Sequence, residues 1–477
     1  MPALTRFANM VIVTVGCLAA CFALYLLHRH GWSRTYVVLL GSAGLLFAGL
    51  RLASTVKISL SLLIATMFIS LYGVEALLRT LLSPGLTWED IHDQTRGLAW
   101  SRDQIDDRAQ RAIQGGQSFD ARDRLQVIKD IEAHGLTAYP PIAGNAYIEY
   151  EGTQILPLAG ISQTTTVYCN ELGQYTIYQS DEHGFHNPPE LWSHQPVEIA
   201  VIGDSFVHGA CVPSEKNFAA LIRSHVPRTL NLGMGGIGPL HELAILKEYG
   251  SVMRPNVVLW VYYEGNDLAD LSHEKNGFFR AYLTRGPFQG LISKQAGIDA
   301  GLIGTIRQVR QEVEQAKVQE NFPDQIEQFM KVDALRKRFG LLFARVTSSE
   351  LDDTLDVLTS VLQEAVALTG TWGGRVVFVY LPHYGRYTNT WLADMDREQV
   401  LVRVHRLNLD VIDLSPVFAA QSDPLKLFPF RSPGHYTVEG NQLVAEHILS
   451  GLSKLSQARA VPVSSSDPAR LGRRSDP

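Results

Sequence analysis

Cysteine is scarce in this chain of 477 residues: there are four, at positions 17, 21, 169 and 211. So small a number excludes a disulfide-rich scaffold, and no cluster of cysteine and histidine has the spacing of a metal site. We therefore expect neither a metal nor another cofactor.

An excess of positive charge is also missing, since the net charge is −6 and no long stretch interleaves aromatic with basic residues. A protein that binds nucleic acid needs a basic surface to neutralise phosphates. We therefore do not expect nucleic acid as a partner.

Charge is absent from three long apolar runs within residues 1–82. Each run is about as long as a helix that crosses a bilayer. The sequence therefore predicts three transmembrane helices, at about 7–27, 35–53 and 57–78. A buried soluble hairpin is the alternative, but its helices would carry a polar stripe that these runs lack.

Basic residues at the ends of these runs favour one orientation slightly. With the N-terminus inside, Arg6, Arg51 and Lys57 lie on the inner side, against Arg29, Arg34 and Arg79 outside. Cytoplasmic loops carry the excess of Lys and Arg. We expect a multi-pass protein of the bacterial inner membrane, with its large domain on the periplasmic or extracellular side.

Residues 83–195 are polar, with helical patterns over Ser101–Gln114 and Phe119–His134 followed by β-like segments in 142–182. We interpret this region as a lead-in α+β subdomain that packs on the following domain and is not itself catalytic. At the other end, residues 457–477 are rich in Ser, Pro, Asp and Arg, which predicts a disordered tail.

Residues 196–456 alternate strand and helix patterns. This alternation predicts an α/β fold of three layers, in which helices cover both faces of a parallel sheet. A polar, helical insertion at about 271–346 interrupts the pattern. It is either an active-site lid or a surface hairpin.

Four stretches carry polar or glycine residues just beyond a strand or just before a helix. They are Val197–Ser205, ending in Gly-Asp-Ser; the glycine-rich Leu230–Gly238; Val257–Asp267, ending in Gly-Asn-Asp; and Ser432–Gly440, which contains His435. Parallel α/β sheets bind their ligands at the carboxyl ends of the strands. We expect these four stretches to meet at that edge.

Serine, glycine, asparagine and histidine in this order resemble the four blocks of the SGNH (GDSL-type) hydrolase superfamily. The resemblance implies that Ser205 is a nucleophile and His435 the base that takes its proton. It also implies an oxyanion hole made by the N–H groups of Ser205 and Gly236 and the side chain of Asn266. Gly233 and Gly235 are alternatives to Gly236.

The chain departs from the family pattern in one respect, because the aspartate usual three residues before the histidine is replaced by Ser432. That aspartate would orient the imidazole. The third member is then a backbone carbonyl, Ser432 itself, or a carboxylate from elsewhere such as Asp423 or Glu439. We expect Asp204 and Asp267 to support the site by accepting hydrogen bonds from nearby backbone N–H groups.

The position of Cys211, six residues after Ser205, leaves two possibilities. In an oxidising compartment Cys211 could pair with Cys169 and tie the lead-in segment to the active-site edge. In a reducing compartment both would be buried free thiols.

The resemblance predicts a membrane-anchored serine esterase that removes or transfers a small acyl group, such as acetyl, on a carbohydrate or lipid. Hydrolysis and transfer share an acyl-enzyme, and transfer would need a membrane partner protein. A catalytically weak or inactive SGNH-like module in cell-envelope polysaccharide assembly is an alternative, supported by the missing aspartate. A lysophospholipase or thioesterase is another.

Overall fold

The computed structural model describes residues 2–30, 34–81, 102–142, 147–193, 196–284, 289–317, 348–388 and 390–460. The chain forms two compact units, one of Met1–Gly85 with Glu320–Ala344 and one of Leu86–Gln319 with Arg345–Pro477. Most of the predicted disordered tail and residues 318–347 of the predicted insertion lie outside the described residues.

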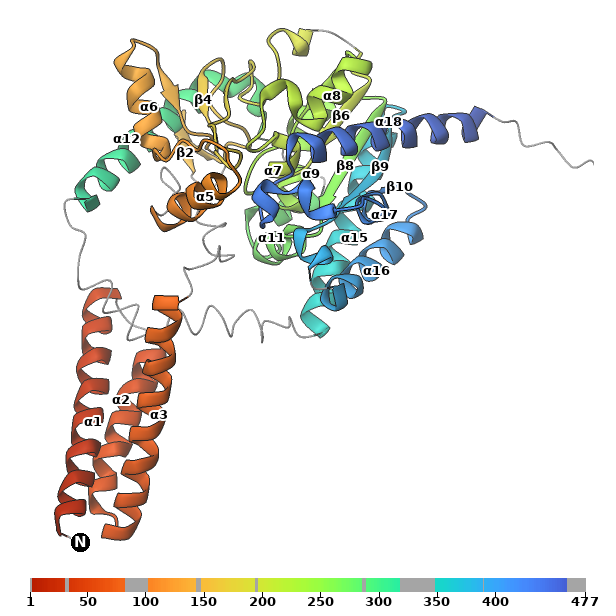
Figure 1. Cartoon of the computed structure of the whole chain (residues 1–477). Helices are drawn as coiled ribbons and strands as arrows, with labels where there is room; N and C mark the ends of the chain where they lie inside the picture. Colours follow the sequence, from red (N-terminus) through yellow and green to blue (C-terminus); the bar gives the residue numbers. More distant parts are fainter. Residues whose placement is uncertain are drawn as a thin grey trace, which may run out of the picture. The chain divides into compact units, whose positions relative to one another are not determined.

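The described part of the first unit consists of apolar helices (Figure 1): α1 (Pro2–His30), α2 (Arg34–Ala48) and α3 (Ser54–Leu81), with a 3-10 turn at Gly49–Arg51. Within the described residues, two segments are long and apolar enough to cross a membrane, Ala3–Tyr25 and Ser54–Val74. Two such helices are consistent with association with a membrane.

The prediction of three spans is wrong for the middle segment. Helix α2 has 15 residues and rises about 22 Å, short of the roughly 30 Å of a hydrocarbon core. The apolar run continues in the sequence, but the backbone leaves the helix through the turn at Gly49–Arg51, and Leu52 is extended. Hydropathy alone does not reveal this break.

A five-stranded parallel sheet forms the centre of the second unit, in the order β10–β9–β8–β6–β7. Its strands are β6 (Ile199–Ile202), β7 (Thr229–Asn231), β8 (Val257–Tyr263), β9 (Arg375–Leu381) and β10 (Asp410–Asp413). Numbered from β6, the order is 2-1-3-4-5, that of flavodoxin-like sheets. The prediction of a parallel α/β sheet is confirmed.

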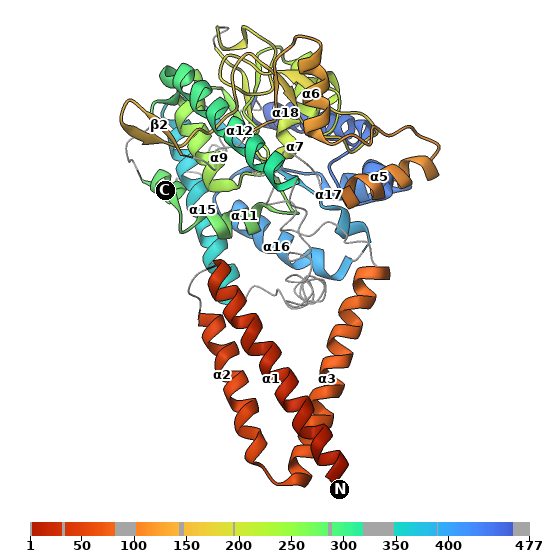
Figure 2. The same cartoon turned by 90° about the vertical axis from the view of Figure 1, so that its left-hand side faces the viewer.

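Alternate residues of each strand pack on opposite faces of this sheet. In β6, Ala200 and Ile202 join one apolar core, whereas Ile199 and Val201 join another. The first core includes side chains from α9 (Pro239–Ile245), α15 (Ser348–Gly370) and α16 (Thr390–Arg406). The second includes side chains from α7 (Ser205–His208), α8 (Phe218–His225), α17 (Ser415–Ala419) and α18 (Val438–Ala460). Figure 2 shows α9 and α15, of the first core, side by side. Burial on both faces explains why the strands are continuously apolar.

The described part of the segment before the sheet contains two α-helices and five short strands. The helices are α5 (Arg102–Gln114) and α6 (Arg124–Ala133); the strands are β1 (Ala138–Tyr139), β2 (Ile148–Tyr150), β3 (Thr153–Ile155), β4 (Thr165–Val167) and β5 (Ile177–Gln179). Helix α6 begins later than its apolar pattern predicts, because Asp123 and Gln126 form a capping box at its start. Strands β1, β4 and β5 form one sheet, and β2 and β3 form a hairpin.

The connection from β8 to β9 contains α11 (Asp267–Glu274), α12 (Gln295–Lys317) and then α15. Helix α12 packs on the β2–β3 hairpin, where Gly301 leaves room for Ile148. It is also held by Asp299, whose carboxylate accepts bonds from the N–H and hydroxyl of Ser162 at 2.9 and 2.7 Å. Helix α12 of the insertion therefore packs on the lead-in segment.

Candidate active site

The turn after β6 places Ser205 at the edge of the sheet. Gly203 has no room for a side chain, since a Cβ would lie 2.5 Å from Val207 Cγ2. Asp204 then caps α7, its Oδ1 accepting the N–H of Phe206 at 2.9 Å. Ser205 is the first residue of that helix, so its own N–H has no partner inside the helix.

His435 lies against this serine although it is 230 positions later in the chain, with His435 Nε2 2.8 Å from Ser205 Oγ. Its ring packs on Phe206, with centroids 4.8 Å apart. The next residue, Tyr436, is buried and donates to the carbonyl of Pro382 at 2.6 Å, which anchors the loop. The structure thus brings together the serine and the histidine of the sequence blocks.

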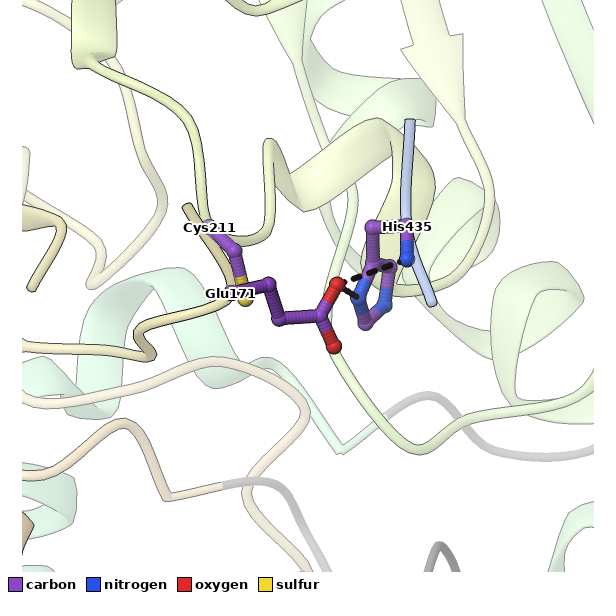
Figure 3. Close-up of side chains that lie close together, drawn as sticks. All are labelled: Glu171, Cys211 and His435. Carbon is purple, nitrogen blue, oxygen red and sulfur yellow. Dashed lines mark hydrogen bonds and ion pairs between the residues drawn. The ribbon is translucent and has the colours of Figure 1, made fainter. Parts of the chain in front are cut away.

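The carboxylate beside His435 is Glu171, from the loop between β4 and β5. Glu171 Oε2 lies 3.2 Å from His435 Nδ1 and accepts the backbone N–H of His435 at 2.7 Å (Figure 3). A carboxylate at Nδ1 orients the imidazole and stabilises its protonated form. We expected the lead-in segment to play no part in catalysis, but this segment supplies the carboxylate.

The candidates that we considered for this position lie elsewhere. Ser432 Oγ accepts a hydrogen bond from Arg111 at 3.0 Å, and Asp423 pairs with Arg431. Glu439 is exposed in the first turn of α18. In the described structure none of these three contacts the His435 ring.

Arg108 on α5 keeps Glu171 ionised. The Glu171 side chain is 5 % exposed, and burial alone would raise its pKa. The Arg108 guanidinium, with Nη1 3.0 Å from Glu171 Oε1, and His435 outweigh burial and hold the pKa of Glu171 well below its usual range. Glu171 is therefore a carboxylate at neutral pH.

The glycine-rich turn after β7 offers one N–H to an oxyanion. Gly233 N–H donates to Asn231 Oδ1 at 2.8 Å, and Gly235 N–H to His208 Nδ1 at 3.1 Å. Among the described residues, no such bond involves the N–H of Gly236. Its φ of 76° suits glycine, and open space surrounds its Cα. Of the three glycines considered, Gly236 is the one whose N–H has no such bond among the described residues.

A buried histidine holds this turn. His208 Nδ1 accepts from Gly235, so the proton of the neutral ring lies on Nε2, which is 2.6 Å from the hydroxyl of Tyr178. Burial lowers the pKa of His208 well below its usual value, which keeps the ring neutral and able to accept. His208 was not singled out in the sequence, where it is an ordinary helical residue.

Asn266 and the two aspartates connect the strand ends. Asn266 Nδ2 donates to Asp204 Oδ2 at 3.1 Å, and Asp267 Oδ2 accepts the N–H of Tyr263 at 2.9 Å. Asp204 Oδ2 also lies 3.4 Å from Ser205 Oγ. Asn266 is buried, and its side chain also forms a hydrogen bond with Asp270.

Cys169 and Cys211 form a disulfide with Cα atoms 5.0 Å apart. Possible ligand atoms of Glu171, Cys211 and His435 lie within 4.8 Å of one another (Figure 3), the one such group among the described residues. The Cys211 sulfur is bonded to Cys169, so it offers no thiolate ligand. These three residues therefore do not fit a metal while the disulfide is intact.

The second unit is an α/β protein with a parallel sheet. Near the carboxyl ends of its strands, Ser205 lies beside His435, which in turn lies beside Glu171. No protein-family model and no curated protein matches the chain. Similar solved structures include a member of the lipolytic protein G-D-S-L family from Veillonella parvula, at 13 % identity over 54 % of this chain and 98 % of the other, with a TM-score of 0.29. Another is LAE5, an alpha/beta hydrolase from the metagenome of Lake Arreo, at 13 % identity over 56 % and 99 %, with a TM-score of 0.31.

Proposed function

We propose that the second unit is a serine esterase of the SGNH type, with Ser205 as nucleophile, His435 as general base and Glu171 as the carboxylate that orients it. One observation carries the proposal: His435 lies 2.8 Å from the Ser205 hydroxyl through Nε2 and 3.2 Å from Glu171 through Nδ1. An unbroken contact of this kind activates an otherwise weak hydroxyl nucleophile.

In the proposed reaction, His435 takes the Ser205 proton as Oγ attacks the ester carbonyl. The N–H groups of Ser205 and Gly236 and the amide of Asn266 stabilise the negative charge on the carbonyl oxygen, each worth roughly 3–4 kcal/mol. His435 then returns the proton to the leaving alcohol, which leaves an acyl group on Ser205. Water or an acceptor hydroxyl resolves this acyl-enzyme.

The substrate that we propose is a small acyl ester, such as an acetyl ester, of a carbohydrate or lipid. We further propose that the apolar helices anchor the protein in a bacterial inner membrane as a multi-pass protein. The disulfide supports a periplasmic or extracellular site for the second unit, because such bonds persist in oxidising compartments. Transfer to another molecule would need a membrane partner protein.

The position of Glu171 beside His435 argues against the alternative of an inactive assembly module. That alternative rested on the missing aspartate at Ser432, and a buried, ionised carboxylate now stands at His435 Nδ1. A lysophospholipase or thioesterase differs from the proposed esterase in acyl length and leaving group, and is separated from it by assay.

The test uses the full-length protein in detergent with p-nitrophenyl acetate and p-nitrophenyl octanoate. We expect Ser205→Ala and His435→Ala to reduce kcat at least 1000-fold and Glu171→Gln by roughly 100-fold or more. Ser432→Ala is the matched control and should retain kcat. A fluorophosphonate should label Ser205, located by mass spectrometry. Turnover that persists in Ser205→Ala overturns the proposal, and faster turnover of the octanoate favours a lipase-like substrate.

A further inference from the structure

The Cys169–Cys211 disulfide lies between the two parts of the proposed catalytic site. Cys169 stands two residues before Glu171, in the β4–β5 loop, and Cys211 six residues after Ser205, beyond the end of α7. In Figure 3 the Cys211 sulfur and the His435 ring lie on either side of Glu171. The bond therefore joins the segment that carries the carboxylate to the segment that carries the nucleophile.

The β4–β5 loop also has other contacts: Glu171 pairs with Arg108 and accepts the N–H of His435, and Asn170 donates to the carbonyl of Asp120 at 3.1 Å. The backbone pairing of the segments that follow β4 and precede β5 ends with a hydrogen bond from Thr176 N–H to the carbonyl of Cys169 at 2.9 Å. Glu171 therefore lies beyond the paired backbone. The Thr176 hydroxyl donates to the carbonyl of Val212 at 3.0 Å. Among the described residues, the apolar cluster around the disulfide consists of Tyr168, Cys169, Tyr178, Ala210 and Cys211.

The backbone at Cys211 also depends on its surroundings. Its φ is 60°, a left-handed conformation that residues other than glycine rarely adopt. Such a conformation persists where neighbouring contacts impose it. Once the sulfur is released, the backbone around Cys211 is free to relax, and with it the loop that carries Glu171.

We propose that this disulfide positions Glu171 for catalysis, so that the esterase works at full rate only while Cys169 and Cys211 are bonded. The inference rests on the proposed function. Reduction by a dithiol transfers two electrons and two protons: the S–S bond breaks, each cysteine becomes a thiol, and the dithiol closes to its own disulfide. Glu171 then loses its fixed distance to His435 Nδ1, and the imidazole is no longer oriented.

This makes the activity depend on the compartment. A chain held in a reducing cytoplasm would keep its serine and histidine but not the placed carboxylate. The same chain in an oxidising compartment would have all three in position.

The first test measures kcat and KM of the full-length protein in detergent before and after reduction with dithiothreitol. We expect kcat to fall roughly 10- to 100-fold with little change in KM, because Glu171 acts on His435 and not on the substrate. Reoxidation should restore kcat. The Cys17→Ser/Cys21→Ser variant is the matched control, since both cysteines are exposed and free; it should respond to dithiothreitol like the wild type.

The second test asks whether the disulfide acts through Glu171. Cys169→Ser/Cys211→Ser, Glu171→Gln and the triple variant are compared by kcat. If the bond positions Glu171, the triple variant should be no slower than Glu171→Gln, because residues that act as a unit are not additive. A loss in the triple variant equal to the product of the two separate losses would overturn the proposal.

Circular dichroism and a second variant, Cys169→Ala/Cys211→Val, separate positioning from folding. A folded protein with reduced kcat supports the proposal. If the reduced wild type and both cysteine variants are all unfolded, the bond maintains the fold and the proposal is overturned. Turnover by Ser205→Ala would instead refute the proposed function, whatever the effect of reduction.

Discussion

Replacing Arg108 by glutamine should expose how much the site depends on one buried charge. Arg108 and Glu171 are 10 % and 5 % exposed, with Nη1 and Oε1 3.0 Å apart. At an effective dielectric constant of about 20, two unit charges at that distance attract each other by about 5 kcal/mol. Removing one partner of a buried pair costs about 3–5 kcal/mol, because the other charge stays buried and unpaired.

For Arg108→Gln we expect the free energy of unfolding of the second unit to fall by about 3 kcal/mol. At roughly 2 °C per kcal/mol for a domain of this size, the melting temperature should fall by about 6 °C. Thermal unfolding followed by circular dichroism measures this change. Arg111→Gln is the matched control, because Arg111 lies on the same helix but is exposed; its melting temperature should change by less than 2 °C.

The same variant should make catalysis sensitive to acid. In the wild type the pKa of Glu171 is depressed, so its ionised form stabilises the fold above about pH 4.3, its usual pKa, and this contribution is lost only as the pH falls below that value. Without Arg108 the pKa of Glu171 rises, because the effect of burial is then opposed by His435 alone, and the carboxylate becomes protonated at a higher pH than in the wild type. The ratio of variant to wild-type kcat should therefore decrease from pH 8 to pH 5. A ratio that is constant over this range, with an unchanged melting temperature, would refute the role given to the ion pair.

Further predictions concern the oxyanion hole and cofactor dependence. Asn266→Ala should lower kcat on p-nitrophenyl acetate by about 100- to 1000-fold with little change in KM, since the lost donor acts on the transition state; a change confined to KM would contradict this. His208→Phe should lower kcat by roughly tenfold, because Gly235 N–H loses its acceptor and the glycine turn loses an anchor; wild-type kcat in this variant would show that the turn is held by other contacts. Dialysis against EDTA should leave the kcat of the oxidised protein unchanged, because the proposed chemistry uses side chains and backbone N–H groups alone, whereas a loss restored by Zn²⁺ would show a metal requirement.

Much of the fold was predictable because it depends on local patterns. Continuous apolar runs such as Val257–Tyr263 identify strands buried on both faces, and helices between them require a parallel sheet. Membrane helices were less predictable: hydropathy located all three apolar runs but did not reveal that α2 ends at Ala48, which leaves two segments long enough to cross a bilayer.

The glycine turn shows a finer limit. Residue type alone does not distinguish Gly233, Gly235 and Gly236. Only the spacing of the blocks in the resembling family favoured Gly236. Tertiary contacts distinguish them, because the acceptors Asn231 and His208 occupy two of the three N–H groups. The sequence likewise left open whether Cys169 and Cys211 pair. Knowledge of this bond would have pointed to Glu171 as a candidate, because Glu171 lies two residues from Cys169.

By itself, the sequence predicted the parallel sheet and the serine, asparagine and histidine that lie just beyond a strand or just before a helix, since each choice depends on residues that are close in the chain. Only the tertiary structure decided which carboxylate serves His435. Glu171 lies 264 positions earlier, in a segment with no motif of its own. Its position beside His435 is a matter of tertiary contacts, such as the ion pair with Arg108, and these leave no periodic or local pattern in the chain.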